Sequence, residues 1–468
     1  MEITLQFLGA AENVTGSCYL LRANGKNLLI DCGLYQERQF KHRNWEPLPI
    51  PADEIDAVLL THAHLDHCGL LPKLYKDGFR GSVHCTSATA DIASIVMLDS
   101  ARIQVEDVAY KKKRHARQHR KSPHPLEPLY EVSDAEKCIE LFQATDYRQV
   151  VNVSQGIEAI FFDSGHILGS SAIRVKITQG GESRTVLFSG DVGRWDIPIL
   201  RDPQAIDQAD YVLCESTYGD RVHAPSSDIK QKFCDIVNDT RKRGGNVIIP
   251  SFAVERSQEL LYYLNELVKE GCLPQMLVFL DSPMAVKVTD IFKKHPELFD
   301  KEMVEHLNDG TSPFDLPGLS LVRTANQSKA INQIHGTAIV IAGSGMCTGG
   351  RIKHHLVNNI SRPENTILFV GYQAQGTLGR IILEGEKDVR ILGENYSVAA
   401  RIAKINGFSA HADRNELTRW LSSLKQAPRH LFVVHGEVNV AHGFADYVTK
   451  EMGWEASVPQ YGDIKTLS

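Results

Sequence analysis

Short apolar runs separated by turn residues dominate the first 208 residues of the chain. Five of these runs have the length and composition of β-strands, at 28–30, 57–60, 157–162, 173–177 and 186–188. Four of them end in loops that carry a histidine or an aspartate: Asp31, His62, His166 and Asp191. We expect one edge of a sheet or sandwich to collect these loops, which is a typical way to build a site.

The pattern changes between residues 211 and 396 to alternating buried strands and amphipathic helices. Apolar runs at 246–249 and 276–280 are followed by helical periods over 256–270 and 284–295, and further buried parallel strands are expected at 338–341 and 367–370. From residue 398 the first pattern returns, with a strand at 431–434 that ends at His435. We therefore expect a first domain formed by residues 1–208 and 396–468, with a separate α/β domain inserted at 209–395.

Composition indicates a folded chain that does not enter a membrane. Of the 468 residues 43% are hydrophobic and 23% charged, with a formal net charge of −6. No run approaches the roughly 18 apolar residues of a membrane span, and the first residues alternate like a strand, unlike a signal peptide. We expect a cytoplasmic protein without a membrane partner. Its nine cysteines lack CxxC spacing, so we assign them to the core without a chemical role.

The segment 111–121 is strongly basic and contains no acidic residue. It is compatible with a solvated helix end and with contact to a phosphate backbone, because clustered Lys and Arg are the usual electrostatic footprint of nucleic-acid binding. Both readings stay open at this point.

The densest cluster of chemistry-bearing residues follows the strand 57–60. Within six positions it places His62, His64, Asp66 and His67, the residue types that zinc binds. His62 and His64 are two apart in an extended segment and project to the same side. Asp66 and His67 precede a helix that we expect over 68–74. Four ligand-type residues at this spacing predict a site for two metal ions.

Later strand ends offer the additional ligands that two ions need. His166 follows the run 161–162, and Asp191 follows the run 186–188, each directly after a glycine. Asp191 has two carboxylate oxygens and so could bridge two ions. Taken singly, such residues are more often turn or cap residues, but together with the first cluster they favour a metal centre.

The HxHxDH motif at 62–67, with Asp31, His166 and Asp191, resembles the metallo-β-lactamase superfamily. This resemblance implies an α/β fold, the αββα sandwich, with a dinuclear zinc centre. Further blocks are similar to those of the β-CASP family, whose inserted domain has a parallel sheet. These blocks lie at 214–219, 249–260, 281–285, 343–346, 371–380, 407–413 and 434–437. They are most similar to the branch that contains the nuclease subunit of the cleavage and polyadenylation specificity complex and its bacterial relatives.

The family resemblance implies a zinc-dependent ribonuclease of RNA processing or decay. It would hydrolyse phosphodiester bonds of single-stranded RNA with a metal-bridged hydroxide. His435 indicates RNA, since DNA-cutting relatives carry an apolar residue in that motif. We expect endonucleolytic cleavage and leave 5′-to-3′ exonuclease activity and a homodimer open.

Site residues follow from the same resemblance, position by position. His62, His64 and His166 would hold one zinc ion, and Asp66, His67 and His435 the other, with Asp191 bridging them. Asp66 would also belong to the catalytic set, with His411 as general acid beside Glu215. Asp31 would orient the ligand histidines.

Contacts to RNA are expected in the inserted domain. Ser344 and Gly345 lie in a glycine-rich turn after a buried strand, where backbone amides can bind phosphate. Arg256 and Arg380 are candidate phosphate partners, although a buried structural arginine is an equal alternative.

Three other functions remain as alternatives. A DNA-directed β-CASP nuclease would share most of the motifs. A small-molecule metallohydrolase acting on thioesters or lactones would share HxHxDH, but it leaves the insertion and His411 without a role. An inactive nuclease-like scaffold would have lost its metals, whereas every ligand position here holds a ligand-type residue.

Overall fold

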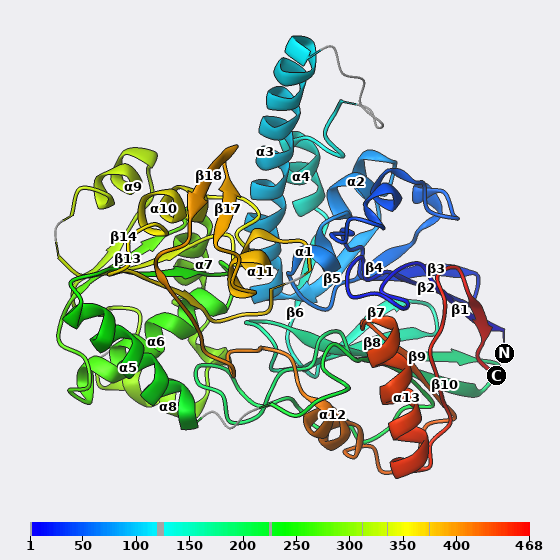
Figure 1. The fold of residues 1–468 in the computed structure, drawn as a ribbon. Helices are drawn as coiled ribbons and strands as arrows, with labels where there is room; N and C mark the ends of the chain where they lie inside the picture. The colour runs from blue at the N-terminus through cyan, green and yellow to red at the C-terminus, as the bar shows by residue number, and fades with distance from the viewer. Residues whose placement is uncertain (1, 119–125, 224–226, 311, 335, 374) are drawn as a thin grey trace. The chain divides into compact units, whose positions relative to one another are not determined.

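Two compact units make up the chain, shown in Figure 1 as a computed structural model. The structure describes residues 2–118, 126–223, 227–310, 312–334, 336–373 and 375–468, with the backbone only at 114–118 and 227–228. Unit 1 comprises Met1–Trp195, Asp202–Val222 and His411–Ser468. Unit 2 comprises Asp196–Arg201 and His223–Ala410.

Unit 1 contains two seven-stranded mixed sheets. The first sheet has the order β22 (Ile464–Thr466), β1 (Ile3–Phe7), β2 (Tyr19–Ala23), β3 (Lys26–Ile30), β4 (Ala57–Leu59), β5 (Ser82–Thr86), β6 (Phe142–Thr145). The second has the order β21 (Ala456–Ser457), β20 (His430–Val434), β11 (Tyr211–Glu215), β10 (Glu182–Phe188), β9 (Ser171–Gln179), β8 (Ile157–Asp163), β7 (Val150–Ser154). Strands β3 to β6 of the first sheet pair with one another in parallel, and so do β10, β11, β20 and β21 of the second, whereas the other pairings are antiparallel.

The core of unit 1 lies between these sheets. One cluster joins inward-facing side chains such as Phe7 and Leu59 of the first sheet to Phe161, Phe188 and Val434 of the second. Burial alternates along β9, which has the pattern expected of a strand with one face on a core. The expected strands therefore form, and they pack face to face as a sandwich.

Helices cover the outer faces of unit 1. They are α1 (Leu65–Cys68), α2 (Leu71–Lys76), α3 (Ser87–Gln118), α4 (Val132–Ile139), α12 (Arg414–Leu421) and α13 (Val438–Met452), with short 3₁₀ turns at Lys41–Trp45 and Ala52–Glu54. Trp420 of α12 and Phe444 of α13 pack in a second cluster against the outer face of the second sheet. The layers are those of the predicted αββα sandwich, so this expectation is confirmed.

The helix expected over 68–74 is wrong in its bounds. The chain instead forms α1 and α2, because Pro72 in the first turn of α2 lacks an N–H and starts a new helix. As a result Asp66 and His67 lie within a helix, not before one.

Unit 2 is built on a six-stranded sheet in which every pairing is parallel. Its order is β14 (Leu319–Leu321), β13 (Leu277–Asp281), β15 (Ala338–Ala342), β12 (Val247–Pro250), β16 (Thr366–Phe369), β19 (Arg401–Lys404). A separate hairpin joins β17 (Asp388–Ile391) and β18 (Glu394–Ser397). The helices are α5 (Ser227–Lys242), α6 (Arg256–Lys269), α7 (Pro283–Phe292), α8 (Lys301–Asn308), α9 (Ala325–Ile331), α10 (Ile352–Asn359) and α11 (Leu378–Leu383), with a 3₁₀ turn at Pro296–Leu298. The inserted parallel α/β architecture is confirmed.

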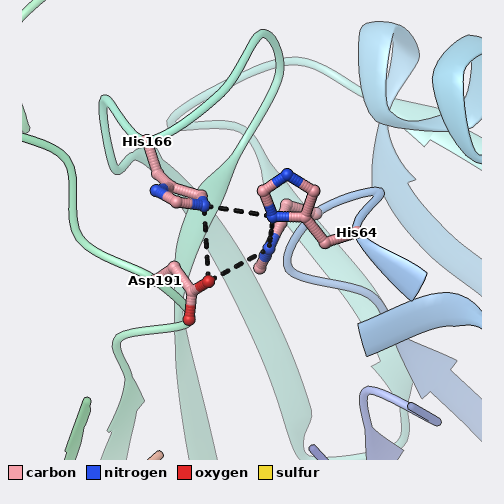
Figure 2. Close-up of side chains that lie close together, drawn as sticks. His64, His166 and Asp191 are labelled. Carbon is pink, nitrogen blue, oxygen red and sulfur yellow. Dashed lines mark hydrogen bonds and ion pairs between the residues drawn. The ribbon is translucent and has the colours of Figure 1, made fainter. Parts of the chain in front are cut away.

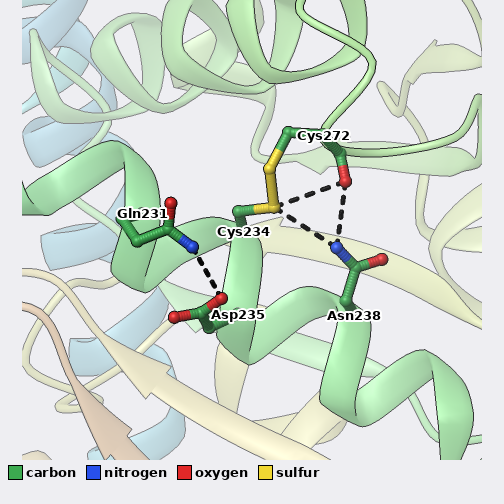
Figure 3. Close-up of a disulfide and its surroundings, with 5 residues drawn as sticks. All are labelled: Gln231, Cys234, Asp235, Asn238 and Cys272. Carbon is green, nitrogen blue, oxygen red and sulfur yellow. Dashed lines mark hydrogen bonds between the residues drawn. A yellow bond between two sulfur atoms is a disulfide. The ribbon is translucent and has the colours of Figure 1, made fainter.

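A disulfide joins Cys234 of α5 to Cys272, which follows α6 (Figure 3). Asn238 donates a hydrogen bond of 2.9 Å to the carbonyl oxygen of Cys272 beside it. The other seven cysteines are free and buried. Assigning no chemical role to any cysteine is therefore wrong for this pair, since its 38-residue separation gives no motif that could reveal it.

Part of the basic segment continues helix α3. Lys111, Lys112 and Lys113 are exposed, and residues 119–121 lie outside the described part of the chain. No helix within the described ranges is both long enough and apolar enough to cross a membrane.

Candidate metal centre

Seven ligand-type side chains meet in unit 1, although they are far apart in the sequence. His62 and His64 follow β4, and Asp66 and His67 lie in α1. The remaining three follow strands of the second sheet: His166 after β8, Asp191 after β10 and His435 after β20. Loops from both sheets thus supply the cluster, as the strand-end pattern predicts.

Three histidines and Asp191 form the first group. Nδ1 of His64 lies 3.1 Å from Nε2 of His62 and 3.2 Å from Nε2 of His166. Oδ2 of Asp191 lies 3.3 Å from both of these Nε2 atoms. Figure 2 shows the His64, His166 and Asp191 side chains pointing toward one another. Ligands about 2.0–2.1 Å from a tetrahedral zinc ion are roughly 3.3 Å apart, so this spacing suits one ion.

The second group consists of Asp66, His67 and His435. Nε2 of His435 lies 3.2 Å from Nε2 of His67 and 3.6 Å from Oδ2 of Asp66. Oδ1 of Asp191 is 3.4 Å from Nε2 of His67 and 3.5 Å from Nδ1 of His435. Each oxygen of Asp191 therefore faces a different group.

The protonation states of the first group suit metal binding. Burial lowers the pKa of His62 to about 3 and that of His64 to about 4, and it also lowers the pKa of His166 well below its usual value. These rings are neutral near pH 7 and keep a lone pair for a metal. Burial alone would raise the pKa of Asp191, but His435 and His67 outweigh it and keep the carboxyl ionised.

Buried polar atoms in the cluster also match a cation. Oδ1 of Asp191 is buried and accepts no hydrogen bond from any residue that the structure describes. A buried carboxylate oxygen without a donor is costly unless a cation compensates it. The donor set consists of imidazoles and carboxylates, and Asp191 offers one oxygen to each of the two groups. This donor set therefore fits divalent ions of the zinc type.

Asp31 contacts His67 of the second group through the ring nitrogen that does not face the other ligands. Its Oδ2 is 2.7 Å from Nδ1 of His67, and its carboxylate also accepts hydrogen bonds from the Thr61 backbone N–H at 2.8 Å and hydroxyl at 2.9 Å. Burial opposes protonation of His67, but Asp191 and Asp31 outweigh burial and raise its pKa. This contact orients the ring so that Nε2 faces the cluster.

Two residues of the site have a left-handed backbone although neither is glycine. Asp31 has φ of 60° and His435 has φ of 49°. Their backbone N–H groups donate to Leu59 and Ala10 carbonyls at 3.0 and 2.7 Å, which helps to hold the strained turns. The turns direct both side chains toward the cluster.

His411 and Glu215 lie beside the metal-ligand cluster. Nδ1 of His411 is 3.2 Å from both carboxylate oxygens of Glu215 and 3.8 Å from Oδ2 of Asp191. Burial disfavours protonation of His411, but Glu215 and then Asp191 outweigh it and raise its pKa to about 9. Glu215 is held in turn by the Val192 backbone N–H, which donates to its Oε1 at 2.7 Å.

Sequence reasoning missed two threonines that contact the ligands. Thr61 places its hydroxyl 3.1 Å from Nδ1 of His62, and Thr217 places its hydroxyl 3.2 Å from Nδ1 of His435. Thr61 precedes the histidine motif directly, which is a local signal. Thr217 lies 218 positions from His435, and only the pairing of β11 with β20 brings them together.

The residues expected to contact RNA lie in unit 2 and in different settings. The Ser344 hydroxyl accepts hydrogen bonds from the Thr348 and Gly349 N–H groups and closes the turn that contains Gly345. Arg256 is buried, pairs with Glu259 and lies over the Phe408 ring. Arg380 is partly exposed and pairs with Glu384 at 2.6 Å. Arg256 thus has the setting of a structural arginine, whereas Arg380 retains access to solvent.

Family models match three consecutive parts of the chain. Residues 12–225 match the metallo-beta-lactamase superfamily, and residues 257–382 match the Beta-Casp domain. Residues 395–459, which include His411 and His435, match the Zn-dependent metallo-hydrolase RNA specificity domain.

Curated relatives match over almost the whole chain. A protein of Thermus thermophilus named Ribonuclease TTHA0252 is 38% identical over 97% of this chain and 98% of its own length. Proteins named Transcription termination factor FttA are 31% identical in Methanocaldococcus jannaschii and 32% identical in Methanosarcina mazei. This chain covers 70% and 68% of their respective lengths.

A solved structure shares the fold. The crystal structure of a protein of unknown function from Enterococcus faecalis covers all of both chains with a TM-score of 0.56 at 12% identity. The metal-ligand cluster, the order of the family models and the full-length match to the Thermus protein agree. The chain belongs to the β-CASP family of metal-dependent hydrolases within the metallo-β-lactamase superfamily.

Proposed function

We propose that this protein is a zinc-dependent ribonuclease that hydrolyses phosphodiester bonds of single-stranded RNA. The observation that carries the proposal is the arrangement of two ligand groups around Asp191, with the His411–Glu215 pair beside them. The name of the Thermus relative and the RNA specificity model over 395–459 support RNA as the substrate. They also favour RNA over DNA and over a small-molecule thioester or lactone.

Two zinc ions per chain are part of the proposal. His62, His64 and His166 would hold one ion, and Asp66, His67 and His435 the other. Asp191 would contribute one oxygen to each, which is consistent with its two oxygens facing different groups. When bound, zinc supplies Lewis acidity that lowers the pKa of water and stabilises charge on phosphate oxygens.

His411 would act as the general acid for the departing 3′ oxygen. Glu215 accepts from Nδ1 of His411 and orients the ring, which leaves Nε2 as the atom that can deliver a proton. The buried carboxylate also favours the protonated imidazole. The 3′ hydroxyl would thus leave as a neutral group.

Cleavage assays test the proposal. Metal-depleted and zinc-restored protein are each incubated with labelled single-stranded RNA, with single-stranded DNA and with a thioester. We expect zinc-restored protein to cut RNA faster than DNA and to leave the thioester intact. If metal-depleted protein cut RNA as fast as zinc-restored protein, the zinc requirement would be contradicted. Preferred cleavage of DNA or of the thioester would contradict RNA as the substrate.

Endonucleolytic cutting is the mode that we propose. Circular RNA offers no end to an exonuclease, so its cleavage at a rate similar to that of linear 5′-labelled RNA would support endonucleolytic cutting. Cleavage restricted to linear RNA, with mononucleotides released from the 5′ end, would show the exonuclease alone.

A further inference from the structure

Phe252 presents an aromatic ring to solvent at the carboxyl end of β12. Its exposed fraction is 40%, which is high for a phenylalanine in a folded unit. The ring lies close to the backbone of Gly345. A Cβ on Gly345 would come within 2.7 Å of Cδ2 and Cε2 of the ring, and one on Gly371 would lie 3.7 Å from the same Cε2. The Gly345 position therefore leaves room for the ring only because it is glycine, whereas a side chain at Gly371 would make ordinary van der Waals contact with it.

The backbone that carries this ring is well anchored. The Ser257 hydroxyl donates to the carbonyl oxygen of Phe252 at 2.7 Å, and the Ser251 hydroxyl donates to the same oxygen at 3.1 Å. The ring is therefore displayed on a rigid turn, which lowers the entropy lost when a ligand binds.

A second aromatic ring is exposed after the neighbouring strand. Tyr372 is 47% exposed and directly follows Gly371, in the loop after β16. Strands β12 and β16 are parallel neighbours, so their carboxyl ends share one edge of the sheet. Two exposed rings at adjacent strand ends are less easily explained as scattered surface residues than either ring alone.

The connections that follow the strands diverge at this edge. The chain leaves β12 through α6, whereas it leaves the flanking strands β15 and β16 through α10 and α11. Ile352 and Leu356 of α10 and Ile382 of α11 pack in one cluster with the sheet, and no described residue of α6 belongs to that cluster. The helices therefore lie on opposite faces. In open parallel sheets, such points of divergence are where ligands bind.

We propose that Phe252 and Tyr372 form a stacking platform for unpaired bases of an RNA strand. Aromatic rings bind single-stranded nucleic acid by stacking, because every base has a π-face. This inference rests on the proposed function. It adds a contact to RNA bases that is separate from the metal ligands and does not depend on the RNA sequence. The platform should distinguish strands with bases from strands without them.

Binding to holoenzyme that does not cut its ligand tests the platform. Zinc-loaded His411→Ala protein serves as parent, and gel electrophoresis verifies that the RNA stays intact. Fluorescence anisotropy then measures Kd for a labelled single-stranded RNA and for an abasic oligonucleotide of equal length. We expect Phe252→Ala to weaken binding of the RNA about 5- to 150-fold and to leave binding of the abasic strand unchanged.

Matched variants separate stacking from folding and from general apolar contact. Phe252→Trp should keep the parent affinity, whereas Phe252→Leu should lose it like alanine. Leu277→Ala removes another exposed apolar side chain, at the amino end of β13, and should change neither Kd. The thermal midpoint of each variant checks the fold.

Two results would overturn the platform. One is an unchanged Kd for RNA in Phe252→Ala, and the other is an equal loss for RNA and the abasic strand. If the parent bound no RNA at all, the proposed function itself would fail together with the platform.

Discussion

The metal-ligand cluster of unit 1 and the carboxyl edge of the sheet in unit 2 use strand ends in different ways. In unit 1 the strand ends carry buried imidazoles and carboxylates that contact one another, such as His62 and Asp191. In unit 2 the strand ends carry exposed rings, Phe252 and Tyr372, beside glycine backbones. Burial fixes the protonation states and the positions of the side chains in unit 1, and a catalytic site requires both. Exposure in unit 2 leaves an aromatic surface that a ligand can cover.

The backbone also differs between these two places. Unit 1 holds Asp31 and His435 in left-handed conformations that are unfavourable for residues with a Cβ, by roughly 1–2 kcal/mol each. Gly345 in unit 2 instead provides space for the neighbouring ring of Phe252. At these positions a strained turn directs a side chain toward one spot, and a glycine lets an aromatic ring lie close to the backbone.

The largest effect is expected from Asp191→Ala, which tests whether one residue joins the two ligand groups. Loss of the shared carboxylate should reduce bound zinc below two ions per chain. Cleavage should fall roughly 10³- to 10⁵-fold, because several kcal/mol of metal stabilisation are lost. Elemental analysis and RNA cleavage rates measure both, with the exposed Asp207→Ala as control. Two ions retained per chain would contradict the bridging role.

His411→Ala should have the next largest effect and should separate proton transfer from metal binding. We expect full zinc content with cleavage reduced about 10²- to 10⁴-fold, since the variant lacks only the proposed general acid. His442→Ala, which removes an exposed histidine of α13, is the matched control. An unchanged rate would remove His411 from the mechanism, and loss of zinc would make it a ligand.

Cys234→Ser tests whether unit 2 can be weakened without affecting the chemistry of unit 1. Closing a 38-residue loop stabilises by about 2–4 kcal/mol, mainly through the unfolded chain. The variant should unfold at a lower temperature, with zinc content unchanged, and reductant should lower the midpoint of the parent to match. Thiol titration of denatured, unreduced parent should count seven thiols. Nine thiols would contradict the disulfide.

Asp31→Asn should have the smallest effect. It tests whether the Asp31 carboxylate orients His67 of the second ligand group. The zinc affinity of that group should fall roughly 10- to 100-fold, because His67 loses the carboxylate that orients it. Competition with a chromophoric chelator measures the affinity, and Asp207→Asn controls for the loss of one negative charge. An unchanged affinity would contradict the orienting role of Asp31.

Much of the fold was predictable because the hydrophobic pattern reports burial directly. Continuous apolar runs such as 338–341 became central strands of a parallel sheet, and alternating runs became strands of the sandwich. The boundary between α1 and α2 was not predicted, although Pro72 at the start of α2 is visible in the sequence. Hydrophobic periodicity does not register the missing N–H of a proline.

The candidate ligands were recognisable because only a few residue types bind metal ions. The HxHxDH motif, His166, Asp191 and His435 are therefore conspicuous in the sequence. Their sequence alone determined which chemistry the chain could support. Only the tertiary structure decided that Thr217 contacts His435, that Cys234 pairs with Cys272, that Arg256 is buried and that Phe252 is exposed. Those facts depend on distances between segments far apart in the chain, which are set by the packing of sheets and helices and not by the order of residues along one strand.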